Sequence, residues 1–185
     1  MKNGIRFFFT SLFIILSRAY DAYSTFGYTP DLENEANPLV SWLGLGWTPL
    51  LIVITILMVY SIVVYYLATF RPVDFFPKET GFNFEEFSTF IYLGKKDKWL
   101  SYFYKIPDSL GRFNNYMGIF MTRCLVFAGI VSTIMWLLIK YTESYLEHFH
   151  SARLIYVILI VGGILVMWAG HRQLFRQYQN QQMNS

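Results

Sequence analysis

Long apolar runs separated by short polar stretches form the dominant pattern of this 185-residue chain. A helix that crosses a bilayer needs about 20 mostly apolar residues, because the lipid interior cannot hydrogen-bond an open backbone. Three runs meet this requirement, over about residues 49–70, 116–139 and 154–170. The first of them has no charged residue, and the second carries only Arg123. The third is short, so the polar residues at its ends, His171 among them, must extend toward the headgroups.

The apolar run at the N-terminus is shorter, because only the ten residues Phe7–Leu16 follow one another without a charge. A helix extended over about residues 5–27 would be long enough to span, provided that Arg18 and Asp21 face protein rather than lipid. The alternative is a signal peptide that is cleaved after Ser17-Arg18-Ala19. We favour the longer, retained helix, which brings the predicted number of spans to four.

The composition agrees with a membrane protein. Hydrophobic residues make up 55% of the chain and aromatic residues 20%, and a soluble protein of this length would expose large apolar patches. The sequence therefore predicts an all-α membrane protein, a four-helix bundle that forms a single membrane domain over residues 1–185. The expected partners are the lipid bilayer and either another membrane protein or a second copy of the chain. Nucleic acid is not expected, because acidic residues are mixed among the basic ones.

The distribution of basic residues predicts the orientation. Cytoplasmic loops carry an excess of Lys and Arg, and here such residues gather before the first span, between the second and third, and after the fourth. They are Lys2, Arg6, Arg71, Lys78, Lys95, Lys96, Lys98, Lys105, Arg112, Arg172 and Arg176. The other two loops are acidic. Both termini are therefore predicted to be cytoplasmic, and residues 176–185, rich in Gln and Asn, are expected to fray.

The cytoplasmic segment 71–115 is too aromatic for a solvated linker. Asn83 followed by Glu86 predicts a helix start, and Gly94 predicts the end of that helix. Lys95, Lys96 and Lys98 then lead into the aromatic stretch Trp99–Tyr104, and aromatic rings beside lysines are typical of residues at headgroup level. The segment is interpreted as an interfacial, partly helical connector, and the alternative is a docking surface for a partner.

Charged residues inside a span are candidates for function, because lipid makes them costly. Arg18, Asp21 and Thr25 are spaced i, i+3 and i+7, so they share one face of the first helix, where Arg18 and Asp21 can form an ion pair. This pair could serve packing or belong to a polar site that faces the bundle interior. Arg123 could extend to the cytoplasmic headgroups or bind an anionic lipid or substrate group.

Small residues in the fourth span, Gly162, Gly163, Ala169 and Gly170, would permit close helix packing within the bundle or between copies.

Metal, redox and common catalytic signatures are weak or missing from the sequence. Glu143, Glu147 and His150 would share a face if the third helix continued past the membrane, but one Glu-x-x-His pair makes an exposed loop the simpler interpretation. No histidine lies in the middle of a span, and the only cysteine is Cys124 in an apolar run. The sequence has no His-Glu-x-x-His, Gly-x-Ser-x-Gly, Cys-x-x-Cys or Walker motif. No cofactor is expected.

Two short motifs lie near the outer end of the first span. One is Asp-x-x-Ser-Thr at residues 21–25, and the other is Glu-x-Asn-Pro at residues 35–38, whose Asn-Pro also predicts a cap and a short helix over 39–45. Together they resemble a pattern in small prokaryotic multi-pass membrane proteins of unknown function. This resemblance implies a prokaryotic inner membrane and one outer polar cluster. In that cluster Thr25 and Asn37 would be the hydrogen-bond partners of Asp21 and Glu35, and with Arg18 the expected cluster has five members.

Two functions follow from these patterns. The first is a non-enzymatic accessory or interaction subunit of a membrane complex. The alternative is a transporter that handles lipids or small molecules, or an intramembrane enzyme, built on Asp21, Glu35, Asn37 and Arg123. A water-accessible cavity between the helices would favour the alternative, whereas a solid bundle with an exposed apolar groove would favour the accessory subunit.

Overall fold

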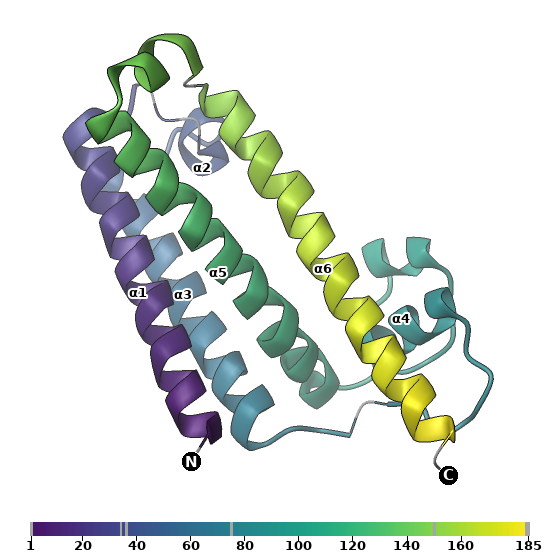
Figure 1. The fold of residues 1–185 in the computed structure, drawn as a ribbon. Helices are drawn as coiled ribbons and strands as arrows, with labels where there is room; N and C mark the ends of the chain where they lie inside the picture. The colour runs from purple at the N-terminus through teal and green to yellow at the C-terminus, as the bar shows by residue number, and fades with distance from the viewer. Residues whose placement is uncertain (1, 34, 36, 75, 150, 184–185) are drawn as a thin grey trace. The chain divides into compact units, whose positions relative to one another are not determined.

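A computed structural model describes residues 2–33, 35, 37–74, 76–149 and 151–183. All regular secondary structure in these residues is helical, as the sequence predicts (Figure 1). The elements are α1 (Lys2–Tyr28), α2 (Pro38–Ser41), α3 (Trp47–Phe70), α4 (Phe84–Leu93), η1 (Trp99–Phe103), α5 (Leu110–Tyr141), η2 (Tyr145–Phe149) and α6 (Ala152–Met183).

Three of the described helices are long and apolar enough to cross a membrane: α3, α5 and α6 from Leu154 to Met183. This indicates an integral membrane protein and agrees with three of the four predicted spans. Helix α1 has 27 residues, so at 1.5 Å per residue it measures about 40 Å, but its polar residues leave it outside this group.

Tertiary contacts make α6 longer than predicted. The helix continues to Met183, so the expectation of a frayed segment from residue 176 is wrong for the described part. Leu174 and Tyr178, one helical turn apart, are buried in an aromatic core, and the Tyr178 hydroxyl donates a hydrogen bond of 2.7 Å to the carbonyl oxygen of Glu79. These contacts stabilise the polar C-terminal end of α6, where water would otherwise compete for the backbone hydrogen bonds of the helix.

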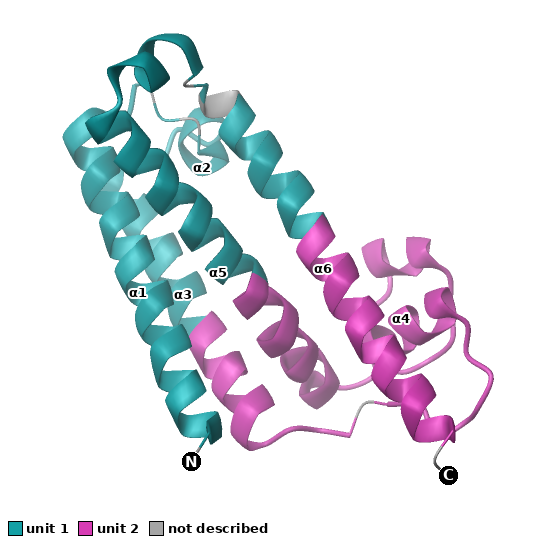
Figure 2. Ribbon diagram, in the orientation of Figure 1, with its two compact units in different colours: residues 1–60, 124–164 teal, residues 61–123, 165–185 magenta. Residues whose placement is uncertain are grey.

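The chain divides into two compact units (Figure 2). Unit 1 contains residues 1–60 and 124–164, and unit 2 contains residues 61–123 and 165–185. In unit 1, α1 and α5 pack closely at Gly129, where an added Cβ would stand 2.6 Å from the Ser17 hydroxyl oxygen. Helices α5 and α6 meet in the same unit where the ring of Phe127 lies against Gly162.

Unit 2 is built around α4, which begins and ends as the sequence predicts. The Asn83 side chain accepts from the backbone N–H of Glu86 at 2.9 Å, and the Glu86 carboxylate accepts from the Asn83 N–H at 3.1 Å. Gly94 ends the helix in the left-handed conformation, with φ of 86°. The helix packs into an aromatic core formed by Phe82, Phe87, Ile91, Tyr116, Phe120, Leu174 and Tyr178.

The aromatic segment that follows α4 divides between the interior and the surface of unit 2. Tyr102 stacks on Tyr92 with ring centroids 4.8 Å apart, and its hydroxyl donates to the Ser88 carbonyl oxygen, so this ring is part of the packed interior. Its apolar neighbours point outward with exposed fractions of 68–88%: Leu100, Phe103, Tyr104, Ile106 and Leu110.

The hydrogen bond from Lys105 lowers the pKa of the nearby Asp97 carboxyl well below its usual range.

Candidate ligand-binding cavity

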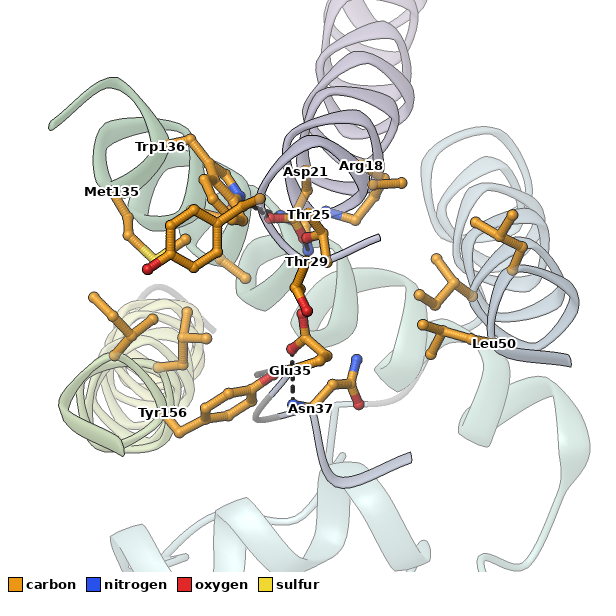
Figure 3. A pocket seen from close by; sticks show the side chains of 18 of the residues that line it. Arg18, Asp21, Thr25, Thr29, Glu35, Asn37, Leu50, Met135, Trp136 and Tyr156 are labelled. Carbon is orange, nitrogen blue, oxygen red and sulfur yellow. Dashed lines mark hydrogen bonds and ion pairs between the residues drawn. The ribbon is translucent and has the colours of Figure 1, made fainter. Parts of the chain in front are cut away.

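A cavity of about 320 Å³ lies within unit 1, between α1, α3, α5, α6 and the loop that follows α1 (Figure 3). Its lining includes all five residues of the predicted polar cluster: Arg18, Asp21, Thr25, Glu35 and Asn37. The residues that the sequence grouped together therefore lie in the wall of one cavity. The remaining lining residues are Ala22 and Tyr28 of α1, Thr29 of the loop, and residues of α3, α5 and α6, helices that the motifs did not include.

The ion pair predicted on α1 is present and is bonded to α5. Nη1 of Arg18 lies 3.3 Å from Oδ2 of Asp21, and Nη2 of Arg18 donates to the Ser132 hydroxyl at 2.8 Å. The Trp136 indole N–H donates to Oδ1 of Asp21 at 2.8 Å. Each charge thus meets its opposite and a polar group on the neighbouring helix, which lowers the cost of placing both in an apolar environment, although the buried Nε of Arg18 has no hydrogen-bond partner among the described residues.

The loop carrying the Glu-x-Asn-Pro motif forms its own hydrogen-bonded turn. Oε1 of Glu35 accepts from the backbone N–H of Asn37 at 2.8 Å, and Oδ1 of Asn37 accepts from the N–H of Leu39 at 3.0 Å. Asn37 is therefore the N-cap of α2, as predicted, but α2 ends at Ser41 instead of Leu45. The Trp47 indole N–H donates to the carbonyl oxygen of Pro30 at 2.7 Å and connects this loop to α3.

The members of the polar cluster share a cavity, and Glu35 accepts from Asn37 as predicted, although the donor is the backbone N–H. Asp21 bonds to Arg18 and Trp136, and Asn37 bonds to the backbone of its own turn. The indole group of Trp136 takes the place expected for Thr25. A tryptophan in an apolar run gives no sequence signal that its N–H will meet a carboxylate 115 positions away.

The rest of the wall is aromatic and aliphatic. Among the described residues, four with aromatic rings line the cavity: Tyr28, Trp47, Trp136 and Tyr156. Tyr156 points toward Glu35 (Figure 3). The aliphatic part is Ala22, Leu50, Leu51, Ile54, Leu57, Met58, Leu125, Ala128, Met135, Ile155 and Leu159. The cavity is therefore amphipathic, with polar groups from α1 and the loop and a mostly apolar wall from the other helices.

Arg123 belongs to unit 2 and is not among the described residues that line this cavity. It lies on α5 against Gly170, where an added Cβ would stand 3.0 Å from its Nη1. Of the alternative site built on Asp21, Glu35, Asn37 and Arg123, the first three residues are among those that line this cavity.

The four small residues predicted for packing behave differently from one another. An added Cβ at Gly162 would stand 2.1 Å from the Phe127 ring, and one at Gly170 would stand 2.7 Å from the Phe120 ring, so both positions serve packing within the chain. An added Cβ at Gly163 would meet nothing within 4 Å, and Ala169 is exposed.

The weak metal candidate gains no support. Helix α5 ends at Tyr141, so Glu143 and Glu147 are not carried on its continuation, and His150 lies outside the described residues. Within the part of the chain that the structure describes, no group of three or more His, Cys, Asp or Glu side chains could hold a metal ion.

A buried histidine in unit 2 corrects another expectation. His171 is 3% exposed, so it does not extend toward the headgroups. Its Nδ1 lies 2.8 Å from the carbonyl oxygen of Met167, and its Nε2 lies 3.2 Å from the hydroxyls of Tyr102 and Tyr116. Because a carbonyl only accepts, Nδ1 donates to Met167, and Nε2 accepts from the Tyr116 hydroxyl, since the Tyr102 hydroxyl donates its one proton to the Ser88 carbonyl. The stacked Phe120 ring, 4.3 Å away between centroids, completes a structural network.

Comparison with known proteins gives no match to this chain among family models, curated proteins or solved structures. The resemblance of residues 21–25 and 35–38 to small prokaryotic membrane proteins stays a prediction.

Proposed function

We propose that the cavity of unit 1 binds a small amphipathic molecule, and that the protein handles a lipid or small molecule in the membrane. The observation that carries this proposal is the cavity itself, because its wall combines the predicted polar cluster with a long aliphatic surface. Its volume of about 320 Å³ lies at the lower end of the range of small-molecule sites, about 300–1,000 Å³. A solid bundle, the arrangement that would indicate an accessory subunit, would not contain a cavity of this size.

The proposal includes four spans, with α1 as the first, and both termini on the cytoplasmic side of a prokaryotic inner membrane. The charges on α1 support its insertion, because Arg18 and Asp21 bond to each other and to α5 within unit 1. The apolar side chains of Phe8, Phe9, Leu12 and Leu16 are exposed, as expected of a face that meets lipid. The cavity would then open toward the outer leaflet, since the loop that contains Glu35 joins α1 to α3.

A second candidate function is an interaction subunit, and the exposed apolar side chains of unit 2 favour it. Leu100, Phe103, Ile106 and Leu110 are 70–88% exposed, close in sequence to Lys95, Lys96 and Lys98. Apolar side chains beside lysines suit a surface of anionic headgroups. We place segment 71–115 at the cytoplasmic face of the bilayer, where this surface would lie against lipid or a membrane partner.

Thiol labelling on intact cells tests the four-span topology. In a Cys124→Ala background, cysteine introduced by Glu33→Cys or Ser144→Cys should react with a membrane-impermeant reagent, because both positions lie in loops predicted to be external. Cysteine introduced by Lys96→Cys should react only after the membrane is opened. Labelling of position 96 on intact cells would contradict this topology.

A cavity-filling substitution tests the binding proposal. Ala128→Phe would place a ring in the cavity, whereas Ala169→Phe adds the same ring on exposed α6 and is the matched control. Native mass spectrometry in a mild detergent should detect small molecules or single lipids bound to the wild type and to Ala169→Phe. Their occupancy should fall at least tenfold in Ala128→Phe, provided that its thermal unfolding midpoint is unchanged. Equal occupancy in the two variants, or none in the wild type supplied with a membrane lipid extract, would refute the proposal.

A further inference from the structure

We infer that the ligand of this cavity is an uncharged molecule that carries a carbonyl oxygen on a short hydrocarbon body. The inference rests on the proposed binding function and adds the chemical class of the ligand. It depends on which polar atoms of the lining already have a partner and on which atoms remain open to a ligand.

Each charged side chain that the structure describes in the cavity wall already has a bonding partner. These side chains are Arg18, Asp21 and Glu35. Arg18 pairs with Asp21 at 3.3 Å, and the second oxygen of Asp21 accepts from Trp136. The Glu35 carboxylate accepts from the Asn37 N–H at 2.8 Å. These bonds disfavour a charged ligand, because an ion that enters an apolar site needs an opposite charge or strong hydrogen bonds to replace its hydration.

Three uncharged polar groups of the lining make no hydrogen bond with any residue that the structure describes. They are the hydroxyls of Thr25 and Tyr156 and the side-chain nitrogen, Nδ2, of Asn37. Thr25 is only 9% exposed, so bulk water has little access to its hydroxyl. The Asn37 amide is oriented by its role as a cap, since Oδ1 accepts from the Leu39 N–H and leaves Nδ2 open. Because a buried polar group without a partner is costly, a ligand that bonds to these groups is favoured.

The open groups are mainly donors. All three can donate a hydrogen bond, whereas only the two hydroxyls can also accept one. Nε of Arg18, a buried donor without a partner among the described residues, adds to the donor character of this wall. Tyr156 points toward Glu35, which bonds to Asn37, so the Tyr156 hydroxyl and the Asn37 amide lie at the same end of the cavity (Figure 3). A carbonyl oxygen has two lone pairs, no proton and no formal charge, and therefore matches these donors.

The size of the cavity limits the ligand. A volume of about 320 Å³ equals roughly ten water molecules at about 30 Å³ each. That space holds a carbonyl group with a short alkyl part against Leu57, Met58 and Leu159, but not a whole diacyl lipid. The carbonyl could therefore come from the ester linkage of a membrane lipid or from a free ester or ketone, and these share the same contacts.

Chain-matched probes test the inference on the full-length protein in nanodiscs of ether lipid without net charge, which contains no carbonyl group. The probes are 2-octanone, octane, octylamine and octanoate, each titrated as a mole fraction of the lipid while the thermal unfolding midpoint is followed. 2-Octanone should raise the midpoint and saturate at a mole fraction about fivefold or more below those of the other three, the effect of roughly one hydrogen bond.

Two substitutions identify the contacts. Thr25→Val and Tyr156→Phe each remove one open hydroxyl and nearly keep the shape of the side chain, so each should weaken 2-octanone binding by about threefold to tenfold and leave octane unchanged. Tyr23→Phe removes an exposed hydroxyl on α1, outside the described cavity lining, and is the matched control that should bind like the wild type. If Thr25→Val, at a buried position, does not fold, Tyr156→Phe alone decides.

The outcomes separate this inference from the proposal on which it rests. Equal binding of all four probes, or tightest binding of octylamine or octanoate, would leave an amphipathic site and overturn its preference for a carbonyl. Unchanged 2-octanone binding in both hydroxyl variants, or an equal loss in Tyr23→Phe, would overturn it as well, because the assigned hydroxyls would then not be the contacts. If no probe binds, the inference fails, and the occupancy measured with the membrane lipid extract decides separately whether the binding function fails too.

The lipid of the nanodisc distinguishes the two sources of the carbonyl. Weaker binding of 2-octanone in nanodiscs of ester lipid than in nanodiscs of ether lipid would identify the ester linkage of a membrane lipid as the occupant. Equal binding in the two lipids would identify a free ester or ketone.

Discussion

Replacement of Asp21 by leucine is expected to lower the free energy of unfolding by about 2–3 kcal/mol. The substitution removes the carboxylate that Arg18 contacts at 3.3 Å and the acceptor of the Trp136 indole N–H at 2.8 Å. Loss of one partner from a buried pair costs about 3–5 kcal/mol, and the value here is lower because the two side chains are 18% and 31% exposed. The unsatisfied indole N–H adds about 1 kcal/mol.

Asp21→Asn is the informative comparison, because the amide keeps the shape and can still accept from Trp136. It should cost roughly half as much as Asp21→Leu, since only the charge is lost. The measurement is unfolding in mild detergent, followed through reaction of the single thiol of Cys124, which belongs to the same unit, with a fluorogenic reagent. Equal stability of the leucine variant and the wild type would show that the pair has no structural role.

Replacement of Gly118 by alanine is expected to destabilise unit 2 by about 2–3 kcal/mol. A Cβ at this position would stand 2.2 Å from the Val64 carbonyl oxygen and 2.7 Å from the Cβ of Ala68. The closest atom is backbone, so α3 and α5 would have to move apart, and overpacking of this kind costs about 1–3 kcal/mol. Membrane helices depend on such close approach, because lipid provides no hydrophobic drive between them.

Gly163→Ala is the matched control, since this glycine is also helical and has nothing within 4 Å of an added Cβ. It should be neutral or stabilising by up to about 1 kcal/mol, because alanine has the higher helix propensity. Thermal unfolding midpoints of the two variants in the same detergent give the comparison. A Gly118→Ala midpoint at or above that of Gly163→Ala would contradict the close contact between α3 and α5.

Local sequence patterns correctly predicted several parts of this protein. The capping box of Asn83 and Glu86 and the end of α4 at Gly94 depend on atoms within a few residues, so their motifs were sufficient. The same holds for the Arg18–Asp21 pair, which needs only the repeat of one helix. The apolar runs predicted three helices that could cross a membrane, because length and hydropathy are properties of each segment alone.

Contacts between distant residues decided the remainder. Residues 176–183 are polar enough to fray, yet Tyr178 bonds to Glu79, 99 positions away, and keeps this end helical. No sequence pattern distinguishes Gly118 from Gly163, because the difference lies in how closely a second helix approaches each glycine.

The candidate site divides in the same way. Its polar members lie within 20 residues of one another, and their motifs marked them as a group. The partners that fix Arg18 and Asp21, Ser132 and Trp136, are 114 and 115 positions away on another helix. The sequence pattern of an apolar run is the same whether a given side chain contacts lipid or lines a cavity. The sequence therefore determined which charges need a partner. Only the packing of α1 against α5 decided which groups bond to those charges. The tertiary structure also decided that an amphipathic cavity lies beside the charged pair.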